Sequence, residues 1–240
     1  MPGSYIVAGA RTPIGKMSGA LASFSAAELG AFAIKAALER AGVAPEEVEH
    51  VLMGQVIMAG QGQVPARQAV VKAGIPMSTP AANFNKVCLS GLNTIYLADQ
   101  MIQAGEADIV VAGGMESMTN APYIAAGARG GFRYGNTELA DAIIKDGLWC
   151  AFDAMLMGAG TERYTAGNVS REQQDEFSAK SHERAASAIK DGRFDAEIVP
   201  VSIPQRKGDP LLVETDEGVR PGTTVESLGG LKPAFAQGGT

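Results

Sequence analysis

Two spacings of apolar residues recur along this chain, and the change from one to the other predicts where strands give way to helices. Four short apolar runs have the length and period of strands: residues 4–10, 51–58, 81–87 and 108–114. Three intervening segments repeat apolar residues at the 3.6-residue spacing of a helix: residues 26–41, 65–73 and 90–104. Strands that alternate with helices in this way predict a layered α/β domain with a largely parallel sheet.

Local signals sharpen the limits of these elements. Ser25 and Glu28 form a capping-box pattern that begins the first helix, and Gly42 is placed to end it. The run at 108–114 is almost continuously apolar, as expected for a central strand covered on both faces. Residues 4–10 are likewise expected to form a buried strand.

The character of the sequence changes beyond about Thr119. Residues 127–135 are rich in glycine and predict a loop. A second capping box at Ser170 predicts an exposed, charge-rich helix that ends near Ile189. A short strand is expected at 197–203, and a loop-rich region follows it. The later part of the chain therefore predicts an appended domain with little regular sheet.

Composition limits the class of protein. Hydrophobic residues make up 46% of the chain and charged residues 19%, which is typical of a folded globular protein and not of a disordered one. The formal net charge of −6, with no basic cluster, argues against a nucleic-acid partner. The longest charge-free run, 51–66, is too short and too rich in glycine to span a membrane. We therefore expect a cytoplasmic protein with no membrane partner.

The metal-binding and redox residue types are sparse. The chain has two cysteines, Cys88 and Cys150, which lie far apart and outside any Cys-x-x-Cys pattern. This arrangement predicts neither a disulfide framework nor a metal site. Of the two histidines, His50 follows an acidic segment and His182 lies on the exposed helix, so both are expected at the surface. The apolar neighbours of Cys150 favour a packing role.

Cys88 is the strongest candidate for chemistry. It lies where a predicted strand turns into the helix at 90–104, next to the small residues Ser90 and Gly91. A thiol at the start of a helix feels the positive end of the helix dipole, which favours the nucleophilic thiolate. Considered from these residues alone, the alternative is a small buried hydrophobic residue, which is the usual role of a free cysteine.

Several sequence motifs occur in order along the chain. The motif around the cysteine is Asn85-Lys86-Val87-Cys88-Leu89-Ser90-Gly91, and Gly113-Gly114-Met115-Glu116-Ser117-Met118 follows it. Further segments of this kind lie at 6–15, 54–56, 62–69, 194–201 and 231–235. Together these motifs resemble the thiolase family, and acetyl-CoA acetyltransferases in particular. The resemblance covers nearly the whole chain in collinear order, which makes it far more specific than a single glycine-rich motif.

The resemblance implies a fold and its division. Residues 1–118 would form the N-terminal core half of a thiolase-like layered α/β fold. Residues 119–240 would form an inserted loop domain that covers the active site and holds coenzyme A. The second core half would lie beyond Thr240, together with the family's catalytic histidine in a Gly-His-Pro motif and its second cysteine. Neither motif occurs in this chain.

The same resemblance implies the chemistry. Cys88 would take the acyl group from an acyl-CoA thioester, and the backbone N–H of Cys88 would help to hold the oxyanion that forms. The reaction would be the condensation of two acetyl-CoA molecules, or the reverse thiolysis of a 3-ketoacyl-CoA, as in fatty acid metabolism. Coenzyme A would be a substrate and product, with no further cofactor. The 240-residue chain alone is expected to be inactive.

Four residues match positions that contact coenzyme A in the family. Leu148 and Met157 match apolar positions of the pantetheine channel, and Arg220 and Ser227 match positions at the nucleotide end. Leu156 departs from the family pattern, which often has a histidine immediately before the second methionine. An ordinary solvated loop arginine is the alternative interpretation of Arg220.

The resemblance also implies a homotetramer, with subunit contacts at 61–68 and in the loop after Thr119. Two other functions remain open at this point. One is a ketoacyl-synthase type of condensing enzyme, which the Met115-Glu116-Ser117-Met118 motif disfavours. The other is a non-catalytic binding or assembly module, which the absence of the histidine and second-cysteine motifs favours.

Overall fold

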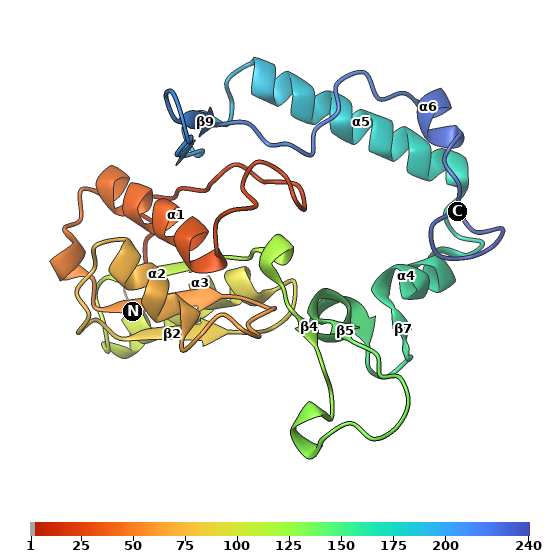
Figure 1. The fold of residues 1–240 in the computed structure, drawn as a ribbon. Coiled ribbons are helices and arrows are strands. Elements are labelled where there is room, and N and C mark those ends of the chain that lie inside the picture. The colour runs from red at the N-terminus through yellow and green to blue at the C-terminus, as the bar shows by residue number, and fades with distance from the viewer. Residues whose placement is uncertain (1–2) are drawn as a thin grey trace. The chain divides into compact units, whose positions relative to one another are not determined.

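The computed structural model describes residues 3–240, and the chain divides into two compact units (Figure 1). The first unit contains residues 3–147 and 197–215 of the described chain, and the second contains residues 148–196 and 216–240. The expected domain division, at residues 118 and 119, concerns the family organisation and remains a prediction. Each unit is described below by itself.

The first unit is built on a three-stranded parallel sheet, as the alternating pattern predicts. β1 (His50–Gly54) lies between β2 (Ala81–Phe84) and β3 (Val110–Gly114). In the register, Val51 pairs with Ala81 on one side and with Val111 on the other. The central strand is therefore β1. The expectation that 108–114 would be central is wrong, because β2 and β3 occupy the two sides of β1 and leave β3 at the edge.

Helices cover both faces of this sheet, and the strand alternation determines which residues they meet. α1 (Ala26–Ala41) and α2 (Pro65–Lys72) pack on the face of β1 that carries Val51 and Met53, where the two helices and the strand share one apolar core. α3 (Ser90–Ala104) packs on the opposite face, where Gly54 points at its first turn. The sheet is thus the middle layer between two helical layers.

The predicted helix limits are largely confirmed. Ser25 accepts a hydrogen bond from the N–H of Glu28, the Glu28 side chain accepts one from the Ser25 N–H, and Gly42 ends α1 in the left-handed conformation. α3 begins at Ser90 and ends at Ala104 as its apolar period predicts. The strands are shorter than expected, and their pairing ends at Gly54, Phe84 and Gly114.

Residues 4–10 do not form the predicted buried strand. Tyr5 and Ile6 are both 83% exposed, and this segment pairs with neither edge of the sheet. Only Arg11 is bridged, to Ile198, and the Arg40 guanidinium donates to the carbonyl of Gly9 at 2.9 Å. The apolar pattern of this segment favours an extended backbone, but such a pattern does not determine whether a neighbouring strand is available for pairing. The segment instead lines a cavity of about 580 Å³ with α1, α3 and β3.

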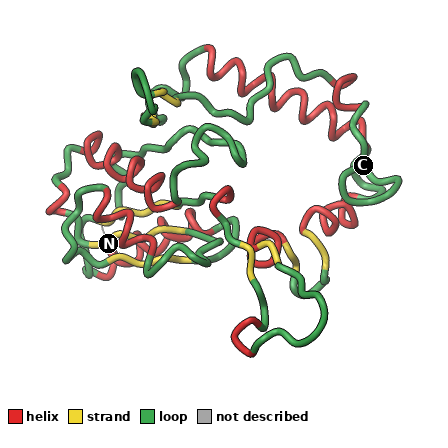
Figure 2. The backbone as a smooth tube through the Cα atoms, in the orientation of Figure 1, coloured by secondary structure: helices red, strands yellow, loops and turns green. Residues whose placement is uncertain are grey.

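Short elements complete the first unit. They are η1 (Pro45–Glu47), η2 (Met118–Asn120), β4 (Tyr123–Ile124), η3 (Ala128–Gly130), β5 (Ala140–Asp141), η4 (Ile143–Leu148, a π-helical turn whose last residue belongs to the second unit), β8 (Val201–Ile203) and β9 (Leu211–Val213). β4 pairs antiparallel with β5, and the chain between them is mostly loop (Figure 2). This agrees with the loop predicted at 127–135. β8 and β9 form an antiparallel pair.

The second unit is mainly helical. It contains the hairpin of β6 (Trp149–Cys150) and β7 (Met155–Leu156), followed by α4 (Met157–Thr165), α5 (Arg171–Lys190) and α6 (Val225–Gly229). Ser170 caps α5 through the predicted capping box. Across residues 3–240, we find no helix with both the length and the apolar character needed to cross a membrane.

Three glycines lie where α3 approaches the sheet. A Cβ atom on Gly54 would lie 2.5 Å from the Gly91 nitrogen, and Gly54 is the register partner of Gly114 on β3. A Cβ on Gly114 would lie 3.4 Å from the Gly91 Cα, at the limit of an ordinary contact. The close approach therefore requires a glycine at Gly54, where the start of α3 lies directly against the carboxyl end of β1.

Gly54→Ala should therefore destabilise the fold. The added methyl meets backbone atoms of Ser90 and Gly91, which cannot move as a flexible side chain can. We expect the free energy of unfolding in urea to fall by about 1–3 kcal/mol. Gly113→Ala is the matched control, since its Cβ would lie 3.6 Å from the Met53 sulfur, an ordinary contact. Equal unfolding midpoints for the two variants would contradict this account.

Candidate nucleophile and ligand-contact site

Cys88 lies in a turn between β2 and α3. β2 ends at Phe84, and α3 begins at Ser90 with Leu89 as its N-cap residue, so Cys88 immediately precedes the cap. This is the predicted placement, between a strand and the helix at 90–104. The side chain is exposed. The carboxyl ends of parallel strands are where an α/β sheet commonly presents reactive groups, and Cys88 follows one of them.

The residue before Cys88 has an unusual backbone. Val87 has φ of 51°, in the left-handed region that a β-branched residue rarely adopts. The turn holds it from both sides. Its N–H donates to Asn85 Oδ1 at 3.0 Å, and its carbonyl accepts from the Ser90 hydroxyl at 2.6 Å. Such a conformation costs on the order of 1–3 kcal/mol and persists only where the surroundings fix it.

Ser90 completes the turn. Its Oγ also accepts a hydrogen bond from the Lys86 N–H at 2.8 Å, and its own N–H donates to the Val87 carbonyl at 3.0 Å. One buried hydroxyl therefore bridges the two sides of the turn that presents Cys88. The sequence indicated Ser90 only as a small neighbour of the cysteine, and this bridging role was missed.

Glu116 was also missed as a functional candidate, although its motif was singled out. It follows β3, and its Oε2 accepts hydrogen bonds from the N–H groups of Val56 at 2.8 Å and Ile57 at 3.3 Å. Its Oε1 is buried and has no hydrogen-bond partner among the described residues. Burial raises the pKa of Glu116 above its ordinary value, and the donors from Val56, Ile57 and Gln55 oppose that shift without cancelling it.

The two histidines belong to different units, and only His50 shares a unit with Cys88. His50 begins β1, whereas Gly54, which contacts the start of α3, ends that strand. Four residues of strand separate them, which is roughly 13 Å. His182 lies on α5 in the second unit, and its Nδ1 accepts a hydrogen bond from the Arg220 N–H at 3.2 Å. His182 thus fastens the Arg220 loop to α5, a role that the sequence did not indicate.

All four predicted ligand-contact residues lie in the second unit. Leu148 and Met157 flank the β6–β7 hairpin. Leu148 ends η4 directly before β6, and Met157 begins α4 directly after β7, so each is next in sequence to one residue of the Trp149–Leu156 pair. These two side chains are 41% and 53% exposed, so they present an apolar surface at one end of the hairpin.

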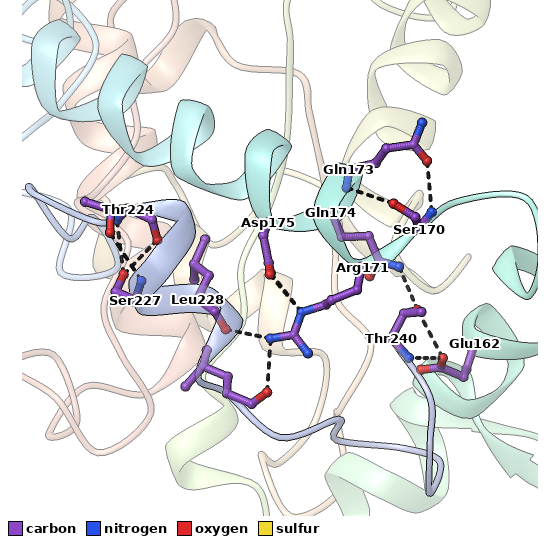
Figure 3. Close-up of polar contacts among 11 residues, drawn as sticks. Glu162, Ser170, Arg171, Gln173, Gln174, Asp175, Thr224, Ser227, Leu228 and Thr240 are labelled. Atoms are coloured by element: carbon purple, nitrogen blue, oxygen red, sulfur yellow. Dashed lines mark hydrogen bonds and ion pairs between the residues drawn. The ribbon is translucent and has the colours of Figure 1, made fainter.

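Arg220 and Ser227 lie near one another in sequence but differ in the contacts of their side chains. Arg220 is exposed in the loop before α6. Ser227 lies in the first turn of α6, where its hydroxyl donates to the Thr224 carbonyl at 2.8 Å and accepts from the Thr224 N–H at 3.1 Å (Figure 3). The Ser227 hydroxyl is thus committed to capping α6, whereas the Arg220 guanidinium extends from an open loop.

The half-buried Arg171 of α5 holds α6 to that helix through its guanidinium. The Arg171 guanidinium contacts both Asp175 oxygens, at 3.0 and 2.9 Å, and also donates to the carbonyls of Leu228 and Leu231 (Figure 3). Asp175 is 8% exposed, so its charge is neutralised by this one arginine. The loop that carries Arg220 is therefore supported at both ends: by His182 near its start and by Arg171 beyond α6.

The second cysteine has a structural setting. Cys150 is half-buried in β6, and its Sγ lies 3.5 Å from Asp153 Oδ2 and accepts from the Asp153 N–H at 3.4 Å. It is free, and so is Cys88. Within the part of the chain that the structure describes, no group of three or more metal-ligating side chains comes together.

The buried carboxyl of Glu116 should give the stability a distinct pH dependence. Its folded-state pKa lies above the ordinary value of 4.5, so the folded protein holds this proton more tightly than the unfolded chain does. The resulting contribution is complete below 4.5 and is lost as the pH rises through the folded-state pKa. Glu116→Gln keeps an acceptor for the N–H groups of Val56 and Ile57 and removes the charge.

We therefore expect Glu116→Gln to gain stability relative to the unmodified chain as the pH rises from about 4 to about 7. Urea unfolding at each pH measures the difference. Glu138→Gln, at an exposed position, controls for the loss of one negative charge. A difference that stays constant, or that falls with rising pH, would show that burial does not govern this carboxyl.

Known proteins are similar to this chain over almost its full length. Residues 4–240 match the family described as the thiolase N-terminal domain. A probable acetyl-CoA acetyltransferase of Mycobacterium leprae is 56% identical over 241 residues, a match that covers 100% of this chain and 61% of that protein. The acetyl-CoA acetyltransferase of Cupriavidus necator is 55% identical, over 98% of this chain and 60% of that protein.

A relative from another bacterium matches a similar share of this chain. The acetyl-CoA acetyltransferase of Pseudomonas aeruginosa is 49% identical, over 98% of this chain and 60% of that protein. The chain thus spans about three fifths of the length of the curated relatives it matches.

Proposed function

The chain belongs to the thiolase family, and we propose that it provides the acyl-accepting nucleophile of an acetyl-CoA acetyltransferase. One observation carries this proposal. Cys88 is an exposed thiol at the carboxyl side of a parallel strand, presented by a backbone turn that is held in a rare conformation immediately before α3. Rare conformations of this kind are concentrated at functional sites.

The first half-reaction uses the thiolate of Cys88. Its sulfur attacks the carbonyl carbon of an acyl-CoA thioester and gives a tetrahedral oxyanion. The oxyanion collapses with cleavage of the bond to the coenzyme A sulfur, which leaves as a thiolate and takes up a proton. The acyl group remains on Cys88 as a new thioester. A covalent intermediate of this kind divides one difficult transfer into two easier steps.

In the second half-reaction, the α-carbon of another acetyl-CoA loses a proton and attacks the acyl group on Cys88. A carbon–carbon bond forms, and the Cys88 thiolate leaves; thiolysis of a 3-ketoacyl-CoA is the reverse. This step needs a base near Cys88. His50 lies at the far end of β1, and His182 is hydrogen-bonded to Arg220. We accordingly propose that the 240-residue chain accepts an acyl group but does not turn over.

Coenzyme A binding is proposed for the second unit. Leu148 and Met157 offer an apolar surface suited to the pantetheine arm, and Arg220 offers a fixed positive charge suited to phosphate. The net charge of −6 means that an anionic ligand needs such a local contact and cannot depend on the general field of the protein. Ser227 contributes by capping α6, which lies beside this loop in sequence.

Acylation of Cys88 is the direct test of the function. We expect the 240-residue chain, incubated with acetyl-CoA, to carry an acetyl group on the peptide that contains Cys88, as measured by mass spectrometry. Cys88→Ala should abolish the modification, and Cys150→Ala should retain it, because Cys150 is half-buried and bonded to Asp153. No catalytic conversion of acetoacetyl-CoA is expected, at least about 10²–10⁴-fold below an enzyme that has its base. Acetylation that persists in Cys88→Ala at wild-type extent would overturn the proposal.

Arg220→Ala tests the ligand contact. Loss of a charged donor to phosphate should weaken coenzyme A binding roughly tenfold, measured by calorimetry, while acetylation of Cys88 at saturating acetyl-CoA continues. Arg206→Ala removes the same charge from an exposed position in the first unit and should leave the affinity unchanged. If both variants bind equally well, Arg220 has no place in the coenzyme A site.

A further inference from the structure

We propose that Asn85 and Glu116 are positioning residues for Cys88, which they hold through the peptide unit that joins Val56 to Ile57. The inference rests on the proposed function for its catalytic meaning, but the contacts that carry it lie wholly in the first unit. Neither residue reaches the thiol directly. Both act on the backbone conformation of the turn that presents it.

The Val56–Ile57 peptide unit is bonded at both of its polar groups. Its N–H, which belongs to Ile57, donates to Glu116 Oε2 at 3.3 Å. Its carbonyl, which belongs to Val56, accepts from Asn85 Nδ2 at 3.2 Å. The Val56 N–H adds a second bond to Glu116 at 2.8 Å. Because a donor and an acceptor on one peptide group polarise each other, these two contacts should strengthen one another.

Asn85 continues the connection to the nucleophile. Its Oδ1 accepts from the Val87 N–H, an Asx turn in which a side chain replaces a backbone acceptor. One amide side chain therefore bonds to the loop after β1 with its nitrogen and to the strained residue before Cys88 with its oxygen. Without this second contact, the cost of the positive φ at Val87 is less well offset, and the turn would relax toward the β region.

The Val56–Ile57 segment is itself well anchored, so it can serve as a fixed point. The Gln55 N–H donates to the Phe84 carbonyl at 3.0 Å, and the Gln61 side chain donates to the Ile57 carbonyl at 2.8 Å. Ile57 is 1% exposed. Asn85, in contrast, is exposed and would gain little order from packing. Its orientation is set by the two hydrogen bonds.

Nearly isosteric substitutions test this arrangement without removing the fold. Asn85→Asp keeps an acceptor for the Val87 N–H and loses the donor to Val56, whereas Asn85→Ala loses both. Glu116→Gln keeps an acceptor and loses the charge. Gln100→Ala is the control, because it removes an exposed amide from α3 that bonds only within that helix, to Tyr96.

The measurement is the rate of alkylation of Cys88 by iodoacetamide in the folded 240-residue chain, with Cys150 as the internal reference. We expect Asn85→Ala to slow Cys88 roughly tenfold, because the reactivity of a thiol depends on its exposure and local environment, which this turn determines. Asn85→Asp and Glu116→Gln should each slow it by a smaller factor. Cys150 should react at its wild-type rate in every variant, and Gln100→Ala should behave as wild type.

The double variant Asn85→Asp/Glu116→Gln distinguishes a shared route from two independent effects. If both residues act through one peptide unit, the combined slowing is less than the product of the single effects. Single effects that multiply would overturn the shared route, and an unchanged Cys88 rate in Asn85→Ala would overturn the positioning role. Variants that only loosen the fold are recognised because they accelerate Cys150 and lower the unfolding midpoint, and that outcome also counts against positioning.

Acetylation by acetyl-CoA, measured on the same samples, keeps this inference separate from the proposed function. If the unmodified chain is never acetylated and yet the alkylation rates follow the expected order, the function fails and the positioning of Cys88 stands. If Cys88 is acetylated in every variant as rapidly as in wild type and alkylation is also unaffected, the positioning fails and the function stands.

Discussion

The close approach of α3 to the sheet is the constraint on which the rest of the first unit depends. Gly54, Gly91 and Gly114 leave no side-chain atoms where β1 and β3 end, so the helix start lies against backbone. Any residue with a Cβ at Gly54 would separate helix and sheet. The turn from β2 into α3 then has little freedom. At one end of it β2 is paired with β1, and at the other end the start of α3 lies against Gly54. The position of Cys88 follows from this packing before any catalytic requirement is considered.

Fixing the turn in this way has an energetic cost that local hydrogen bonds offset. A valine in the left-handed region costs on the order of 1–3 kcal/mol, and each net hydrogen bond returns about 0.5–1.5 kcal/mol. The three bonds that Asn85 and Ser90 make to the Val87 backbone are therefore of the size needed to maintain the conformation, with little excess. Glu116 adds a second cost, since burial opposes its charged form while its carboxylate serves two backbone donors. Stability is given up at several points around one exposed thiol, which is a common arrangement at a reactive site.

The second unit differs from the first, because it has little hydrophobic core to hold its loops in place. Few of its residues are buried, and Asp175 on α5 is one of them. Order comes instead from individual polar contacts: Arg171 binds Asp175 and two carbonyls near α6, and His182 accepts from the Arg220 N–H. Contacts of this kind fix the backbone of a loop while leaving side chains such as Arg220 exposed.

The sequence by itself determined the helices and the parallel sheet, and it singled out Cys88 as the candidate nucleophile. The helix signals are local: the capping boxes at Ser25 and Ser170 and the apolar period of 90–104. Helices form at all three places. Strand pairing is not a local property, because the alternation of apolar residues in a strand does not specify which other strand lies beside it. Residues 4–10 consequently lack the predicted ladder, and 110–114 lies at an edge. The hydrogen bond from Asn85 to the Val56 carbonyl and the burial of Glu116 arise from segments that meet only in the folded chain. Tertiary structure alone decided them, because each depends on contacts between residues that are distant in sequence.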